Sequence, residues 1–211
     1  KSSSSTSRSD VLNLTKQTFL YFINMKPIFY LDFDFDDLEA GVKLISLVDK
    51  PAVKRDFVCF KEDEIKFSFD EAKHLISGVV LLADVPIYRF NKKRGEHYIV
   101  FKKEGIRKTM EQFFKKGLIS SVTLQHKDDT QIEGIYIVES YIKDSERGIV
   151  PIEFADVPDG SWIVTYKVDN LELWEQIVNG NDLNGFSIVG DFDFYLDKKK
   201  DDINEFINNL I

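Results

Sequence analysis

The chain has 211 residues, of which 43% are hydrophobic, and a formal net charge of −8 at pH 7. This length suits one domain with a substantial core, and the negative charge argues against a dedicated nucleic-acid-binding protein, because phosphate contacts need clustered Lys and Arg. The single cysteine, Cys59, excludes an intramolecular disulfide, and no apolar run reaches the ~20 residues of a membrane span.

The first half of the chain predicts a polar tail, a short helix and then a series of strands. Residues 1–9 are rich in serine, which is typical of a flexible tether. Residues 10–24 carry apolar side chains at helical spacing after a capping aspartate. Apolar and acidic residues then alternate along residues 28–36, which predicts a strand. Further strands are predicted at residues 41–48, 56–60, 65–69, 78–82 and 97–101.

The second half predicts two internal helices between strands. The first helix covers residues 104–116 and ends at Gly117, and the second begins at Asn170 and ends at Gly180. The remaining strands are predicted at residues 121–126, 132–141, 162–168 and 185–196, and a polar amphipathic helix is predicted at 198–211.

These elements together predict an α+β domain over residues 25–197. We expect mostly antiparallel strands in a closed or nearly closed β-barrel, with a few packed helices. The tail (1–9), the first helix (10–24) and the last helix (198–211) flank this domain.

Several common functional motifs are missing, which leaves isolated polar residues as candidates. There is no Gly-rich phosphate loop, no paired-cysteine metal motif, no His-Glu-x-x-His and no Gly-x-Ser-x-Gly. Of the three histidines, His74 and His97 lie in polar contexts and are predicted at the surface. His126 ends an apolar strand before a polar turn, where one ring nitrogen can face a site. Position alone nevertheless favours an ordinary surface or hydrogen-bonded histidine.

Ser187 is the candidate nucleophile. It lies between Gly185 and Gly190, which allow the strand to bend and a substrate chain to approach. A serine is a poor nucleophile without a base to accept its proton. Taken alone, the pattern favours a serine packed in a sheet beside a glycine bulge.

Alternating aspartates raise the question of a hard-cation site. Asp32, Asp34 and Asp36 share one face of a predicted strand, and carboxylate oxygens suit Mg²⁺ or Ca²⁺. No second group of ligands is apparent nearby. The pattern therefore favours an exposed charged face, and no metal is predicted.

An ordered set of segments resembles the XkdF-type phage serine protease family. That family is related to prohead proteases and, more distantly, to herpesvirus assemblin. The resemblance spans residues 41–194 and implies a serine endopeptidase without a cofactor, in which Ser187 is the nucleophile and His126 the base. It is carried by residues 45–52, 124–126, 138–140 and 158–162, by the helix ending at Gly180, and by residues 185–188.

The third member of the catalytic site is left open by this resemblance. In the better-known prohead proteases, a segment like residues 46–52 follows the catalytic serine, whereas here it precedes Ser187. The acidic residue that precedes that segment in those proteases falls on Leu44 here. Glu139 and Asp191 are the candidates in its place, and a Ser–His dyad without an acidic partner is the alternative.

The resemblance also implies a biological setting. The expected substrates are scaffold segments, capsid-protein extensions and the chain's own tails, inside an assembling prohead in the host cytoplasm. The expected partners are the capsid and scaffold proteins of the same phage, with self-association and self-cleavage, but no nucleic acid and no membrane.

Two alternatives remain open. One is a non-catalytic capsid-associated or scaffolding module that retains the protease fold, and the other is a generic ligand-binding barrel. The protease interpretation requires His126 and Ser187 to lie on adjacent strands, with their side chains close to hydrogen-bond reach.

Overall fold

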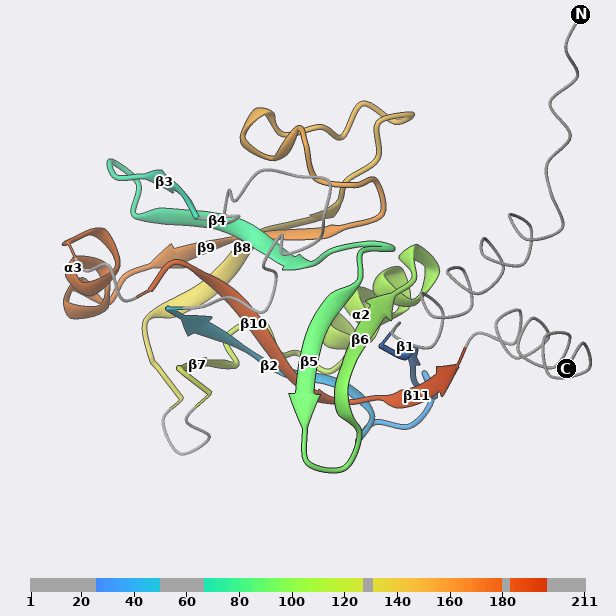
Figure 1. The fold of residues 1–211 in the computed structure, drawn as a ribbon. Coiled ribbons are helices and arrows are strands. Elements are labelled where there is room, and N and C mark those ends of the chain that lie inside the picture. The colour runs from blue at the N-terminus through green and yellow to red at the C-terminus, as the bar shows by residue number, and fades with distance from the viewer. Residues whose placement is uncertain (1–25, 50–66, 127–130, 180–182, 197–211) are drawn as a thin grey trace, which may run out of the picture.

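A computed structural model describes residues 26–49, 67–126, 131–179 and 183–196 (Figure 1). The Ser-rich tail, the predicted helices at 10–24 and 198–211, and the predicted strand at 56–60 all lie outside these residues, as does Cys59. Within the described ranges, no helix is long and apolar enough to cross a membrane.

The described residues form three separate sheets. The first has the strand order β11-β1-β6-β5, the second β10-β2-β7, and the third β3-β4-β9-β8. The strands are β1 (Ile28–Asp32), β2 (Gly41–Val48), β3 (Ser68–Asp70), β4 (Leu75–Leu81), β5 (Ile87–Asn91), β6 (Gly95–Phe101), β7 (Val122–Leu124), β8 (Ile135–Ile142), β9 (Trp162–Val168), β10 (Gly185–Asp191) and β11 (Asp193–Leu196). Two α-helices, α2 (Lys103–Lys115) and α3 (Leu171–Asn179), and the 3-10 helix η1 (Ile152–Phe154) accompany them.

The predicted closed or nearly closed barrel is therefore wrong. The described part of the chain is mostly sheet with two α-helices, and none of its three sheets closes on itself. Residues 185–196, predicted as one strand, are β10 and β11 in two different sheets. The chain changes sheets at Phe192, whose ring packs edge-on against Phe33 (5.9 Å) and Phe101 (5.3 Å).

One hydrophobic core joins the three sheets and α2. Phe186 of β10 packs against Phe67, which precedes β3, and against Tyr166 of β9, with ring centroids 4.5 and 5.2 Å apart. Gly78 of β4 faces the same ring, and a Cβ atom at this position would lie 2.9 Å from it. Only glycine therefore lets β4 approach Phe186 this closely.

Most elements with clear periodicity are confirmed, and turns explain the main differences. The predicted bounds of β2 and β9 match those observed, and α2 is displaced by a single residue. The first strand ends at Asp32 rather than Asp36, because the Asp34 carboxylate accepts a hydrogen bond from the Asp36 amide (3.0 Å) and starts a turn. Strand β5 was not predicted; it pairs antiparallel with β6.

Asp159 precedes β9 and holds the segment that follows β8. Its carboxylate accepts hydrogen bonds from the Ser145 hydroxyl (2.8 Å) and from the Lys143 ammonium (3.0 Å), which is almost fully buried. These contacts, the Ser145 hydrogen bond first among them, hold the pKa of Asp159 below its ordinary value.

We expect Asp159 to make stability depend on pH. A lowered pKa in the folded state stabilises the fold above the ordinary aspartate pKa of about 4, and this contribution is lost as the pH falls through the folded-state pKa. Asp159→Asn should therefore lower the melting temperature at about pH 7, and the difference from wild type should shrink by about pH 2. The exposed Asp156→Asn is the control, and an equal difference at both pH values would contradict the expectation.

Candidate functional site

Three hydroxyl side chains form a row across the sheet β10-β2-β7. Ser187 of β10 lies directly opposite Ser46 of β2, and Ser46 lies beside Thr123 of β7. Side chains of directly paired residues point to the same face of a sheet. The Ser46 Oγ and Thr123 Oγ1 atoms are 2.6 Å apart, which is hydrogen-bond distance. We refer to Ser187, Ser46 and Thr123 as the hydroxyl row.

The hydroxyl row is buried. Ser46 is 0% exposed, Thr123 2% and Ser187 6%. Phe186, the neighbour of Ser187, points to the opposite face and fills the core. The alternation along β10 therefore places Ser187 on the face of the sheet opposite to Phe186, beside Ser46.

Gly190 lets β10 approach β2 closely beyond the serine. The register of the two strands shifts between Val189 and Gly190. A Cβ atom at position 190 would overlap the carbonyl oxygen of Gly41 and lie 2.9 Å from the Cα of Val42. The backbone packing at this bulge thus requires glycine at position 190. This agrees with the predicted bend of the strand.

His126 lies just beyond the end of β7. Gln125 and His126 both have positive φ angles, 52° and 57°, which are uncommon for residues other than glycine and end the strand. The side chain of His126 is exposed. The histidine is therefore on the same sheet as Ser187, at its rim.

The expected adjacency of His126 and Ser187 is not found. Strand β2 lies between β7 and β10, and Thr123, not His126, is level with Ser187. The structure brings Ser187 together with Ser46 and Thr123 instead.

Neither acidic candidate lies beside His126. Asp191 pairs with Gly41, at the end of the sheet opposite to His126, and forms an ion pair with Lys43 (2.7 Å). Glu139 is exposed on β8, which belongs to the third sheet. Leu44 is paired with Val189. The catalytic roles of Ser187, His126, Glu139 and Asp191 stay predictions.

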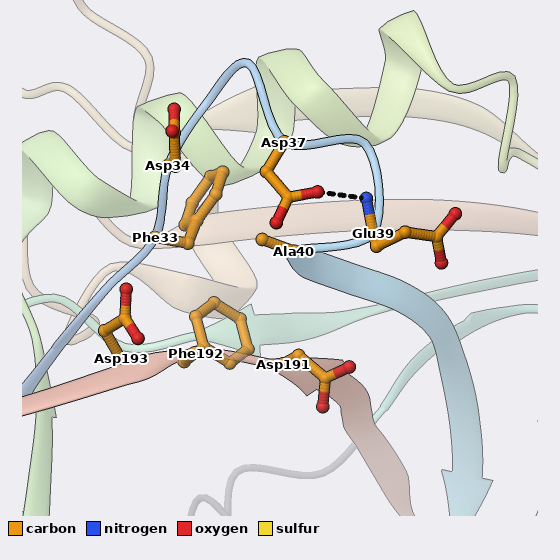
Figure 2. A pocket seen from close by; sticks show the side chains of 8 residues that line it. All are labelled: Phe33, Asp34, Asp37, Glu39, Ala40, Asp191, Phe192 and Asp193. Carbon is orange, nitrogen blue, oxygen red and sulfur yellow. Dashed lines mark hydrogen bonds between the residues drawn. The ribbon is translucent and has the colours of Figure 1, made fainter.

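Asp191 instead lines an acidic pocket of about 230 Å³ (Figure 2). The rings of Phe33 and Phe192 line it, and Figure 2 shows carboxylates around them. The lining residues are Phe33, Asp34, Asp37, Glu39, Ala40, Asp191, Phe192 and Asp193. No group of three or more His, Cys, Asp or Glu side chains suited to a metal ion occurs among the residues that the structure describes.

The sequence interpretation missed Ser46 and Thr123 and misplaced one histidine. Ser46 alternates with the core residues Ile45 and Leu47, so its position on the opposite face of β2 was readable from the pattern. The pairing of Ser46 with Ser187 could not be predicted from the sequence pattern. His97, predicted at the surface, is 1% exposed, and its Nδ1 lies 2.9 Å from the Gly95 carbonyl oxygen.

Comparison with known proteins identifies the family. Residues 64–195 match the family model described as "Putative phage serine protease XkdF". The chain belongs to this family. The XkdF match includes Thr123, His126 and Ser187, whereas Ser46 on β2 precedes it. No curated protein and no solved structure matches the chain. The predicted membership of the XkdF family is confirmed, and the more distant relation to assemblin stays a prediction.

Proposed function

We propose that this protein is a phage serine endopeptidase that cleaves scaffold and capsid-protein segments during head assembly in the host cytoplasm. The observation that carries the proposal is that the match to a phage serine protease family includes both Ser187 and His126. The placement of Ser187 on a glycine-flanked strand, on the face opposite to Phe186, supports its role as the nucleophile.

The proposed reaction is acyl transfer. The Ser187 Oγ attacks the peptide carbonyl while His126 accepts the hydroxyl proton, and His126 then returns that proton to the leaving amine. Water hydrolyses the resulting acyl-enzyme and regenerates the serine. Because β2 separates the two residues, the reaction requires His126 to move toward β10 before the proton is transferred.

Co-expression with the capsid and scaffold proteins of the same phage tests this function. We expect intact-mass measurements to show shortened partner proteins with the wild type and full-length ones with Ser187→Ala. Ser77→Ala is the matched control, because Ser77 is a strand serine bonded to Thr165 (2.8 Å) in the third sheet. Cleavage that persists in Ser187→Ala would refute the assignment, and unchanged chain ends would refute self-cleavage.

A second function is a non-catalytic capsid-associated module that retains the protease fold. The low exposure of Ser187 (6%) and its separation from His126 by β2 favour this alternative. It predicts that both the wild type and Ser187→Ala bind capsid or scaffold proteins and that neither cleaves them. The same co-expression experiment therefore distinguishes the two functions, provided that binding is measured by co-purification.

A further inference from the structure

We propose that the edge of β8 binds an extended segment of a partner protein as an additional antiparallel strand, with an apolar residue opposite Tyr141 and a lysine or arginine opposite Glu139. The inference goes beyond the proposed function, because it does not depend on whether Ser187 cleaves the bound segment.

Strand β8 is the last strand of its sheet, and its outer side offers backbone groups. The N–H of Lys143, just after the strand, donates to the Ser161 carbonyl on the β9 side (2.9 Å). Because N–H groups alternate along a strand, those of Ser140 and Ile142 point to the outer side. Among the described residues, neither makes a backbone hydrogen bond outside its own sheet. An edge of this kind is a template for pairing with another chain.

The beginning of this edge is already closed. The Ile137 N–H donates to the Ile119 carbonyl (3.1 Å), and the register between β8 and β9 shifts between Ile137 and Glu139. A bulge of this kind interrupts regular pairing. The edge that remains open to a partner therefore runs from Glu139 to Ile142.

A pocket of about 430 Å³ lies beside this part of the edge. It is lined by Glu139 and Tyr141 of β8 and by Ile149, Val150 and Pro151 of the loop that follows. Side chains of directly opposed residues point to the same face of a sheet. A residue opposite Tyr141 in an added strand therefore points to the pocket, where its side chain meets the apolar loop.

Apolar side chains are exposed next to the pocket. Ile152, which follows Pro151, is 90% exposed, the most of any large hydrophobic residue among those the structure describes. Val150 is exposed as well. Phe154, in the same 3-10 helix as Ile152, is buried in a small core cluster against which Tyr141 packs. The segment is thus anchored while Ile152 and Val150 stay available, and burial of their apolar surface favours association.

Carboxylates decide which residue fits opposite Glu139. Glu139 and Glu153 form no ion pair with any described residue. Burial, and then the charges of these two carboxylates, raise the pKa of Tyr141 to about 12. Lys73, whose pKa Glu139 helps to raise, forms its ion pair with Asp70 (2.7 Å). The pocket therefore has a negative potential that a lysine or arginine of the partner complements.

Backbone pairing fixes the order of residues in the partner. In an antiparallel strand, the residue opposite Glu139 comes two positions after the residue opposite Tyr141. The residue between them exchanges two backbone hydrogen bonds with Ser140. The recognised pattern is therefore an apolar residue, any residue and a basic residue, in which the backbone supplies affinity and the two side chains supply specificity.

Fluorescence anisotropy of labelled peptides with the full-length chain tests this inference. The probe is the capped peptide Thr-Val-Thr-Val-Thr-Arg-Thr-Thr. One comparison peptide has Glu in place of Arg, and another carries an N-methyl group on the threonine between Val and Arg. We expect the Arg peptide to bind and both comparison peptides to bind about tenfold more weakly or worse, because they lose the charge pair or the backbone hydrogen bond.

A charge reversal locates the binding site. Glu139→Lys should invert the preference, so that the Glu peptide binds about fivefold more tightly than the Arg peptide. Glu175→Lys is the matched control, because it makes the same change of charge on the exposed side of α3 and should keep the wild-type preference. Circular dichroism shows which variants are folded. If Glu139→Lys does not fold, Glu139→Gln replaces it and should abolish the preference for the Arg peptide.

The remaining outcomes overturn the inference. It is refuted if the Arg peptide does not bind at concentrations up to about 1 mM, or if Glu139→Lys and Glu175→Lys change binding equally. It is also refuted in favour of a second copy of this chain if the wild type sediments as a dimer, Glu139→Lys sediments as a monomer and no peptide binds. Ser187→Ala should bind the peptides like the wild type, so a failure of the protease assignment leaves this result unaffected.

Discussion

Replacing His126 by glutamine is expected to slow fluorophosphonate labelling of Ser187 by about 100- to 10,000-fold, the usual range for loss of a general base. Glutamine keeps a polar side chain of similar size but cannot accept the serine proton as a base. Because His126 is exposed at the rim of the sheet, its substitution should leave the melting temperature nearly unchanged. A large loss of labelling rate without a change in melting temperature would therefore show that His126 takes part in the reaction and not in folding.

The matched control for this variant is His74→Gln. His74 also has a positive φ angle (52°), but it stacks on Trp174 with ring centroids 4.6 Å apart and precedes a strand of the third sheet. We expect His74→Gln to label at the wild-type rate. His97 is unsuitable as a control, because it is 1% exposed and its substitution would disturb packing.

The result for His126 also decides between two arrangements of the site. If His126→Gln labels slowly, the histidine must cross the width of β2 to reach Ser187, and the described arrangement is a resting form of the enzyme. If His126→Gln labels as fast as the wild type while Ser187→Ala does not label, another group accepts the proton, and His126 loses its assigned role.

Replacing Trp162 by alanine is expected to destabilise the fold by about 3–5 kcal/mol, the range for deleting a large buried aromatic side chain. Trp162 is 0% exposed, and its ring packs edge-on against Phe113 of α2 at 5.3 Å. Its indole N–H donates a hydrogen bond to the Ser140 hydroxyl (2.9 Å). The substitution removes a contact between α2 and the third sheet and also leaves Ser140 without that donor.

Urea unfolding of three variants measures this effect. Trp162→Phe retains an aromatic ring but lacks the indole N–H, so it should lose less stability than Trp162→Ala. Phe90→Ala is the control for an exposed aromatic residue, because Phe90 is 66% exposed and its loss should change stability by no more than about 0.5 kcal/mol. Equal losses for Trp162→Ala and Phe90→Ala would contradict the position of Trp162 in the core.

Local elements were readable from the sequence because the interactions that specify them are short in range. The periodicity of residues 41–48 and 162–168 marks β2 and β9, and α3 begins where the Asn170 side chain accepts a hydrogen bond from the Leu173 amide (3.0 Å). The turn that shortens β1 depends on the side chain of Asp34, and alternation alone does not reveal it.

Strand pairing was not readable, because it depends on residues far apart in the chain. Alternation predicts that β10 and β11 are extended, but not that they join different sheets on either side of Phe192. The barrel prediction failed for this reason.

By itself, the sequence determined the two internal helices, most strands of the described residues, the family and the two residues that the family resemblance singles out, Ser187 and His126. Only the tertiary structure decided that β2 lies between them and that Ser46 and Thr123 complete a buried row with Ser187. The physical reason is that a side chain's neighbours across a sheet are set by register, and register follows from packing of the whole core rather than from any local pattern.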